Sequence, residues 1–186
     1  MRVACILSNG FEEIEAITPV DVLRRADINC DYYSIDGIEV EGAHGVTIKA
    51  DYLLTDDEQL KNIDMIILPG GMPGAQHLAH NPIVQATIKE FDANNKYIAA
   101  ICAAPALVLG SSGIVAGRKV TCYPGMEHHF SDAIYCHDLV VRDNNIITSQ
   151  GPATAMLFAL ELLKVLKGES NSVANGMLWN KIMELD

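Results

Sequence analysis

The sequence predicts a single α/β domain, a three-layer sandwich in which helices cover both faces of a mostly parallel sheet. Short apolar runs alternate with helical patterns along the chain, and this order specifies the fold class. The run after Asp64, through Leu68, is apolar without alternation, as expected for a strand buried on both faces of a parallel sheet. The 186 residues are 49% hydrophobic and 20% charged, and no repeat, linker or low-complexity segment divides them. We therefore expect residues 1–186 to form one domain.

Strands are predicted where short β-branched and apolar runs end at turn-forming residues. In chain order these runs are Val3–Leu7, Asn29–Ser34, Asp64–Leu68, Tyr97–Ile101 and Val120–Cys122. Two further segments alternate around a turn signal, so each is predicted to be a hairpin. The first is Gly37–Ala50, turning at His44-Gly45, and the second joins Leu139–Val141 to Ile146–Thr148 through Asp143-Asn144-Asn145.

Helices are predicted where apolar residues recur at helical spacing between start and stop signals. They are about Glu12–Arg25, Leu54–Asn62, Pro82–Asn94, Ala153–Leu166 and Ser172–Leu185. Pro19 is expected to interrupt the first helix, which Thr18 would then restart, because Pro suits the first position of a helix. One more helix is expected directly after the strand that ends at Ile101.

Charge and composition exclude several classes of partner. The formal net charge is −11 and no run of Lys and Arg occurs, whereas nucleic-acid backbones and anionic membranes require basic patches. The apolar run at the N-terminus is too short for a signal peptide, and no stretch approaches a membrane span. The five cysteines are irregularly spaced and do not suggest a disulfide framework. We expect a cytoplasmic protein with reduced thiols that binds neither nucleic acid nor membrane.

Cys102 lies where an apolar strand meets a helix, with small residues on both sides. A helix N-terminus aimed at the sulfur favours the thiolate, so this position indicates a nucleophile. Cys5, Cys30 and Cys122 lie inside predicted strands and are expected to be buried. Because ligands bind at the carboxyl ends of parallel strands, we expect three loops to converge around Cys102. These loops are Ser8–Glu15, Pro69–Gly74 and Ile101–Pro105.

Two further groups can complete a site at Cys102. The amides of Gly70 or Gly71 can approach a ligand closely, and with the amide of Ala103 they can bind a developing oxyanion. Three carboxylates, Glu12, Glu13 and Glu15, follow the first strand. Whichever of them turns toward the thiol would have its pKa raised by burial, so it could stay protonated and transfer a proton.

A metal site is not expected. Its candidate ligands have no zinc-motif spacing, and no CxxC pair occurs; they are Cys122, His128, His129, Cys136 and His137. A Cys–His dyad would need a positioned imidazole, but Ala103 follows Cys102. Whether His128 or His129 reaches the thiol is left open by the sequence.

The chain resembles the ThiJ/PfpI superfamily, in the branch of the parkinsonism-associated deglycase. The resemblance covers nearly the whole chain and rests on five motifs. They are Asn9-Gly-Phe-Glu-Glu-Ile-Glu15, Pro19-Val-Asp-Val-Leu-Arg-Arg-Ala26, Leu68-Pro-Gly-Gly71 with Gly74-Ala-Gln76, Ala99-Ala-Ile-Cys-Ala-Ala-Pro105 and Thr148-Ser-Gln-Gly-Pro152.

This resemblance implies a flavodoxin-like sandwich, a homodimer and no cofactor. It implies that Cys102 is the nucleophile, Glu15 its protonated partner, and Gly71 and Ala103 the oxyanion-binding amides. Four further residues fall near positions that line the pocket, an anion site or the dimer interface in relatives; they are Gly70, Tyr123, Arg25 and His44. Tyr123 stands where some relatives carry a His, which puts the rate and substrate range of this chain in question.

The implied function is glyoxalase and deglycase chemistry, in which the thiolate attacks 2-oxoaldehydes such as methylglyoxal, or early glycation adducts, and gives lactate. The alternative is a redox-responsive stress protein or chaperone whose active cysteine is oxidised to the sulfinic acid. A weaker alternative is a cysteine peptidase or amidase. It is disfavoured because the peptidase branch places a His directly after the Cys, where this chain has Ala103.

Overall fold

The protein folds around a seven-stranded sheet in the strand order β10-β11-β7-β6-β1-β2-β5. The computed structural model describes residues 1–184. All neighbouring strands are parallel except the edge pair β10 and β11. The strands span Arg2–Leu7 (β1), Asn29–Ser34 (β2), Tyr52–Leu53 (β5), Met65–Leu68 (β6), Tyr97–Ile101 (β7), Val140–Asp143 (β10) and Ile146–Ser149 (β11). The predicted mostly parallel sheet is confirmed.

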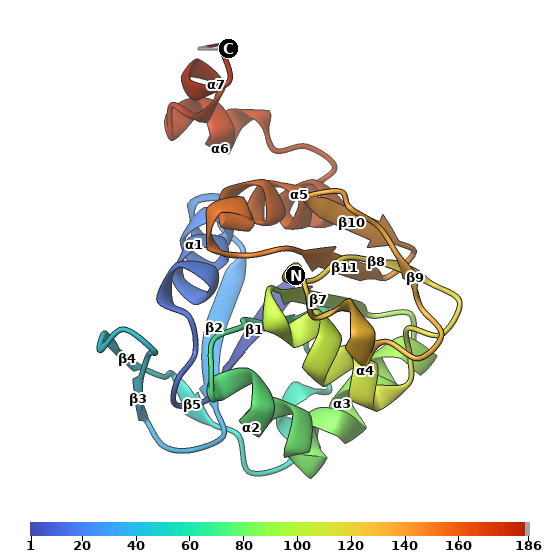
Figure 1. The fold of residues 1–186 in the computed structure, drawn as a ribbon. Helices are drawn as coiled ribbons and strands as arrows, with labels where there is room; N and C mark the ends of the chain where they lie inside the picture. Colours follow the sequence, from blue (N-terminus) through green and yellow to red (C-terminus); the bar gives the residue numbers. More distant parts are fainter. Residues whose placement is uncertain (185–186) are drawn as a thin grey trace.

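Helices cover both faces of this sheet (Figure 1). On one face α1 (Glu13–Arg25) and α5 (Ala155–Lys167) pack over one apolar core, together with Cys5, Leu7 and Ile67 of the strands. On the other face α3 (Pro82–Ala93) packs over a second core that includes Ile6 and Leu68. The helix that follows β7 covers this second face too; it contains a π-helical turn, Pro105–Leu109, and continues as α4 (Gly110–Ser112). Successive strand residues therefore alternate between two cores.

The predicted interruption at Pro19 is wrong, because α1 runs unbroken through this residue. A proline inside a helix removes one backbone hydrogen bond, here the bond that the Glu15 carbonyl would accept. Pro19 is buried and α1 packs against α5, so tertiary packing offsets the missing bond. The predicted start is also one residue early, because Glu12 is the N-cap of the helix.

Several smaller elements differ from the prediction. Instead of a helix over residues 54–62, the chain forms β5 and then a 3₁₀ turn, Asp57–Leu60, closed by a capping box of Asp56 and Gln59. The helix α2 (Gly74–His80) was not predicted. The strand predicted near Val120 is β8 (Lys119–Val120), which pairs with β9 (Ile134–Tyr135) in a separate small sheet.

The hairpin predicted over residues 37–50 is confirmed as β3 (Glu39–Glu41) and β4 (Thr47–Lys49), with Gly45 in the left-handed region at φ 84°. The C-terminal tail forms two short helices, α6 (Asn171–Gly176) and α7 (Trp179–Ile182), rather than one. Leu178 separates them at φ 62°. The predicted end of the tail helix, Leu185, lies outside the described residues.

Candidate active site

The three loops predicted to converge do meet at the carboxyl edge of the sheet. The Glu12 N–H donates to the Gly70 carbonyl at 3.0 Å, and the Gly74 N–H donates to the Gly10 carbonyl at 3.3 Å. The Gly70 N–H in turn donates to Oε2 of Glu15 at 2.8 Å. The loop after β1 and the loop after β6 are therefore joined, and Gly70 also lies against Cys102 of the third loop, since a Cβ on Gly70 would be 2.7 Å from Cys102 Cβ.

Cys102 occupies a strained turn between β7 and the helix that follows it. Its φ is 64°, a left-handed conformation that is uncommon for a residue other than glycine and that clusters at functional sites. Two backbone hydrogen bonds hold the turn. The Cys102 N–H donates to the Ser149 carbonyl at 3.0 Å, and the Tyr123 N–H donates to the Cys102 carbonyl at 2.8 Å. This sharp strand–turn–helix presents the thiol at the sheet edge, as a nucleophile elbow does.

Glu15 projects from the first turn of α1 and is fully buried. Its Oε2 accepts from the Gly70 amide, whereas its Oε1 meets no donor at hydrogen-bonding geometry among residues 1–184. Burial raises the pKa of Glu15 to about 7, although the Cys102 thiol and the Gly70 amide oppose the shift, and the charge of Glu12 adds to it. Glu15 is therefore a carboxyl group that holds its proton up to neutral pH.

The Cys102 thiol is half-buried beside this carboxyl group. Burial raises the pKa of the thiol, and the nearby Glu15 raises it further, while the amides of Ala103 and Gly71 lower it by hydrogen bonding. The expected effect of the helix start is thus present, but burial outweighs it. Two acids coupled in this way titrate as a pair, in which Glu15 loses its proton first, near pH 7, and the thiol keeps its own proton.

Glycines 70 and 71 let the loop after β6 approach the site. A Cβ at Gly70 would lie 2.7 Å from both Cys102 Cβ and Glu15 Oε2. Gly71 has φ 89°, and a Cβ there would lie 2.3 Å from the Glu12 nitrogen. Neither position accepts a side chain without moving the site, because contacts this short do not occur between non-bonded atoms. These glycines are therefore part of the geometry that brings Glu15 to Cys102.

The other residues predicted to line the pocket differ in their distance from Cys102. Tyr123 is near, because its amide bonds Cys102 and its half-exposed ring lies against Gly151, where a Cβ would be 3.5 Å away. Arg25 is far and does not line this pocket, so its place at an anion site or the dimer interface stays a prediction. It lies ten residues beyond Glu15 on α1, about 15 Å along the helix axis, where its Nε donates to Asp21 Oδ2 at 2.6 Å.

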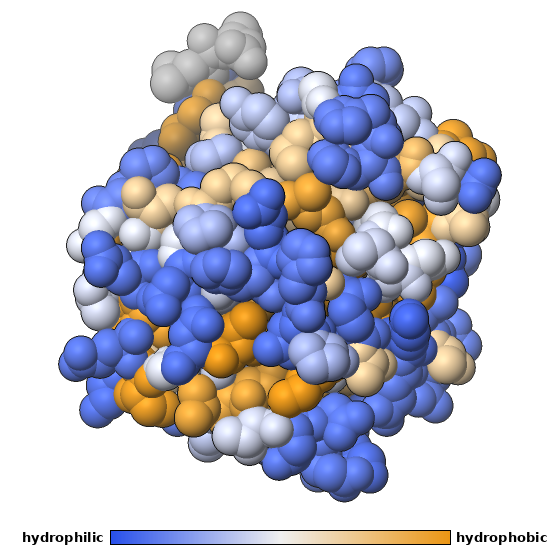
Figure 2. All heavy atoms as spheres, turned by 60° about the horizontal axis from the view of Figure 1, so that its bottom comes forward, coloured by the Kyte–Doolittle hydropathy of each residue, from blue (hydrophilic) through white to orange (hydrophobic). Residues whose placement is uncertain are grey.

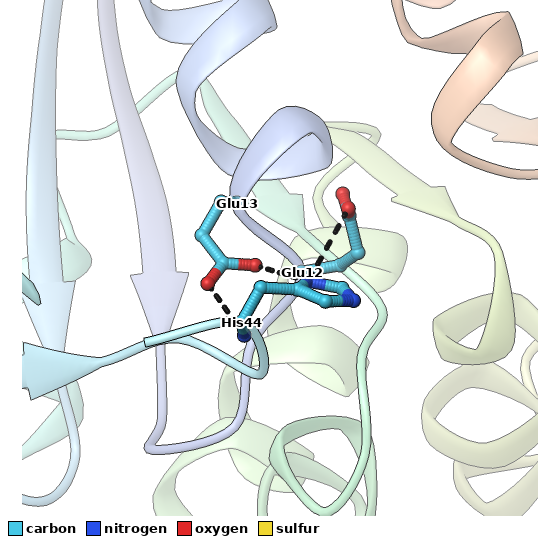
Figure 3. Close-up of side chains that lie close together, drawn as sticks. All are labelled: Glu12, Glu13 and His44. Carbon is cyan, nitrogen blue, oxygen red and sulfur yellow. Dashed lines mark hydrogen bonds and ion pairs between the residues drawn. The ribbon is translucent and has the colours of Figure 1, made fainter. Parts of the chain in front are cut away.

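His44 lies in the turn of the β3–β4 hairpin and is held by Glu13, as Figure 3 shows. Its Nδ1 is 2.8 Å from Glu13 Oε2 and 4.0 Å from Glu12 Oε1. Within residues 1–184 these three residues form the one group of three or more possible metal ligands whose ligand atoms lie within 4.8 Å of one another. The five cysteine and histidine ligands considered from the sequence do not form such a group.

No imidazole in residues 1–184 forms a hydrogen bond to Cys102. The ring of His128 pairs with the Gly125 carbonyl at 2.9 Å and stacks on the ring of His129. The possibility left open by the sequence, a Cys–His dyad, therefore has no geometric support in this part of the chain. The sequence does not predict the role of Ser149, whose backbone carbonyl fixes the Cys102 turn and has no signature in the sequence. Glu12 is one of the three candidate carboxylates, but its role as the side chain that caps α1 at Glu15 is not predicted either.

The candidate site of this flavodoxin-like fold is thus a half-buried thiol on a strained turn, beside a buried carboxylic acid at the edge of a parallel sheet. The model of the DJ-1/PfpI family matches residues 1–165, so the chain belongs to this family. The fold agrees closely with the structure entitled "Toxoplasma gondii DJ-1, oxidized", with a TM-score of 0.89 and 36% identity over 95% of this chain and 97% of that one.

Relatives extend the similarity to proteins of different size. The Protein DJ-1 homolog B of Arabidopsis thaliana is 36% identical over 174 residues, which are 92% of this chain but 40% of that protein. The chain therefore spans about two fifths of the length of this relative. The glutathione-independent glyoxalase of Caenorhabditis elegans is 38% identical over 159 residues, which are 84% of this chain and 83% of the relative. No helix in residues 1–184 is long and apolar enough to cross a membrane.

Proposed function

We propose that this protein converts 2-oxoaldehydes such as methylglyoxal into 2-hydroxy carboxylates such as lactate, with Cys102 as nucleophile and without a cofactor. The observation that carries the proposal is the pairing of the half-buried Cys102 with Glu15, a fully buried carboxyl group whose pKa is about 7. A carboxyl group with a pKa near the working pH can both give and take a proton, which this isomerisation requires. The name of the glyoxalase relative supports the same reaction class.

In the first step the Cys102 thiol passes its proton to the Glu15 carboxylate; the resulting thiolate attacks the aldehyde carbon, and protonated Glu15 gives that proton to the aldehyde oxygen. The product is a hemithioacetal. The Glu15 carboxylate then takes the proton from the former aldehyde carbon and delivers it to the adjacent carbonyl carbon through an enediol, while the hydroxyl proton moves from the first oxygen to the second. The resulting thioester is hydrolysed by water, which releases lactate and restores the thiol. On an early glycation adduct, a hemithioacetal or hemiaminal on a protein or nucleotide, the Cys102 sulfur would displace the bound thiol or amine while Glu15 protonates this leaving group. The substituted group is then free and the same Cys102 hemithioacetal remains, which constitutes deglycase activity.

Backbone amides support the charges that develop along this route. The amides of Ala103 and Gly71 already act on the sulfur, where they stabilise negative charge. In the hemithioacetal, the carbon bonded to the sulfur also carries an oxygen, and these two amides would lie beside that oxygen. We assign them as the oxyanion-binding donors, with Gly70 providing the close approach and Tyr123 the rim of the pocket.

The test is lactate formation from methylglyoxal by wild type, Cys102→Ser and Glu15→Gln, with Cys136→Ser as the matched control. Cys136 is also a half-buried cysteine, but it lies next to β9, outside the site. Loss of the nucleophile is expected to lower turnover by about 10³-fold or more, since removing a covalent nucleophile commonly does so. The control should retain the wild-type rate. Lactate production by Cys102→Ser at the wild-type rate would exclude the mechanism.

A second function is favoured by the accessibility of the thiols. Cys5, Cys30 and Cys122 are buried, whereas Cys102 and Cys136 are half-exposed. Of these two, Cys102 has beside it a carboxylic acid, Glu15, that can hydrogen-bond an oxidised sulfur. We propose that peroxide converts Cys102 to the sulfinic acid and that this signals stress or changes a chaperone-like surface. Intact-mass analysis after mild peroxide should show two added oxygens that peptide mapping assigns to Cys102. Oxygen spread over all cysteines would count against this role.

We further propose that the protein is a homodimer in the cytoplasm. Polar side chains cover most of the face shown in Figure 2, with apolar patches between them. The α1 side chains Ile14 and Ile17 are 53% and 40% exposed, and Val46 of the hairpin, whose backbone bonds Glu13 beside Ile14, is 49% exposed. Analytical ultracentrifugation should give a dimer for wild type and a monomer for Ile14→Asp. A monomeric wild type at micromolar concentration would contradict the proposal.

A further inference from the structure

Glu12 belongs to a closed ring of hydrogen bonds that includes Glu15. The Glu12 N–H donates to the Gly70 carbonyl at 3.0 Å, the Gly70 N–H donates to Glu15 Oε2 at 2.8 Å, and the Glu15 N–H donates to Glu12 Oε2 at 2.8 Å. The ring has one side-chain carboxyl group from each glutamate and both polar groups of the Gly70 backbone. Any shift of Glu12 is therefore transmitted to the Glu15 carboxyl group through two short bonds.

The side chain of Glu12 is itself buried, with 10% of its area exposed. Its Oε1 accepts no hydrogen bond, and the nearest cationic group is Nδ1 of His44 at 4.0 Å, on an imidazole whose side chain is 71% exposed. The titratable groups that face Glu15 are Cys102, from the turn after β7, and Glu12, from its own N-cap. The Gly70 loop contributes a neutral amide. No Lys or Arg is among the groups that act on Glu15.

We propose that Glu12 is a positioning residue: it fixes the Glu15 carboxyl group against Gly70 and keeps a negative charge beside it, so that Glu15 retains a proton for transfer. The role rests on the proposed function, because it acts through Glu15 and touches no reacting atom. The electrostatic part follows from the sign of the charge. A neighbouring anion disfavours ionisation of Glu15, which agrees with the contribution of Glu12 to its raised pKa.

Glu13 provides a matched control for this proposal. It is adjacent to Glu12 and equally buried, at 6% against 8% of the residue exposed. Its carboxyl group faces the hairpin, where it accepts from the His44 and Val46 amides, and it is not among the groups that act on Glu15. Neutralising Glu13 therefore removes a similar buried charge from the same turn of helix without altering the ring.

The experiment follows the C=O stretch of protonated Glu15 by infrared difference spectroscopy from pH 5 to 9 in wild type, Glu12→Gln, Glu12→Ala and Glu13→Gln. The glutamine at position 12 keeps an acceptor for the Glu15 amide but removes the charge. The pH midpoint at which Glu15 loses its proton, near 7 in wild type, is expected to move to lower pH by about half to one unit in Glu12→Gln. Methylglyoxal turnover at pH 7 should fall several-fold in kcat with KM unchanged, and Glu13→Gln should leave the midpoint in place.

Two outcomes would overturn the proposal. The first is an unmoved midpoint in Glu12→Gln, and the second is an equal shift in Glu12→Gln and Glu13→Gln. Circular dichroism confirms that each variant folds, and Glu12→Gln remains informative if Glu12→Ala, which also loses the cap, does not. The carboxyl band needs no aldehyde substrate, so the shift can be read even if no variant, wild type included, produces lactate. In that case the proposed glyoxalase activity fails while the positioning role is still tested.

Discussion

Glu13 and Glu15 lie two residues apart at the start of α1, and both are buried. The pKa of Glu13 is lowered from its ordinary value, whereas the pKa of Glu15 is raised. Glu13 accepts from the His44 amide at 2.7 Å, from the His44 ring at 2.8 Å and from the Val46 amide at 3.3 Å. Burial alone would raise the pKa of Glu13, but these bonds lower it overall. Glu15 receives one amide bond and keeps one oxygen without a donor, so burial raises its pKa to about 7.

The difference shows that the number of hydrogen-bond donors, rather than burial alone, decides whether a buried carboxyl group is ionised or keeps its proton. A carboxylate that accepts several hydrogen bonds is stabilised in its charged form, whereas one left short of donors keeps its proton. Glu13 therefore fastens the hairpin to α1, and Glu15 is left able to exchange a proton with Cys102. Their adjacent positions make this comparison open to direct tests.

The largest expected effect is on turnover. Glu15→Gln is expected to lower methylglyoxal turnover by about 10²- to 10⁴-fold, since an amide cannot carry the proton between the two carbons. Glu13→Gln should stay within about tenfold of wild type, because Glu13 faces the hairpin instead of the thiol. Lactate assays at pH 7 measure both. Equal losses in the two variants would remove the distinction between them.

The next effect is on the pH dependence of stability. The native state holds the Glu15 proton up to about pH 7, whereas the unfolded chain releases it near its ordinary pKa of 4.5. Native Glu15 therefore binds more protons between these values, and the free energy of unfolding falls as pH rises through them. The fall, relative to Glu15→Gln, should reach about 3 kcal/mol. Urea unfolding at pH 4.5 and pH 8 measures it, and parallel pH curves for the two proteins would contradict the raised pKa.

Glu13→Gln should instead destabilise the protein by about 1–3 kcal/mol at neutral pH, because donors buried around the carboxylate lose a charged acceptor. The pKa of Glu13 is lowered in the folded state, so its contribution is present above its ordinary pKa and is lost as pH falls through the folded value. Urea unfolding at pH 7 and pH 4 should show that the free energy of unfolding of the variant is below that of wild type, and that this difference is smaller at pH 4. A constant difference would mean that the ionised carboxylate contributes nothing.

The smallest effect concerns His44, which is exposed and pairs with Glu13. This pairing raises the pKa of His44, so its contribution is present below the ordinary value and is lost as pH rises through the folded one. Hydrogen exchange of residues 39–49 should therefore quicken above neutral pH, beyond the intrinsic increase. In His44→Ala that additional pH dependence should be absent. If it persists in the variant, another group holds the hairpin.

The sequence predicts the central features of this site because they follow from topology. Cys102 lies at a strand–helix join, and the carboxyl ends of parallel strands bring the loops after β1 and β6 to the same edge. The residues alone did not decide which of three glutamates faces the thiol; only the resemblance to a family pointed to Glu15. Which glutamate faces the thiol depends on how the side chains are arranged around the axis of α1. This helix runs through Pro19 because tertiary packing overrides the local preference for a break.

The features that escaped prediction depend on contacts between distant segments. The donors around Glu13 come from a hairpin about thirty residues away, and the oxygen that fixes the Cys102 turn belongs to Ser149. Arg25 was placed in the pocket by similarity of motif, whereas the length of α1 carries it to the opposite end of the helix. Local patterns do not encode such long-range distances.

The central claim, that Glu15 holds its proton beside Cys102 while Glu13 is ionised, is tested most directly by infrared difference spectroscopy between pH 5.5 and pH 8.5. Wild type should show the C=O stretch of a protonated carboxyl group that disappears with a midpoint near pH 7. This band should be missing in Glu15→Gln and unchanged in Glu13→Gln. A wild-type spectrum without that band at pH 5.5, or a band that survives in Glu15→Gln, would contradict the account.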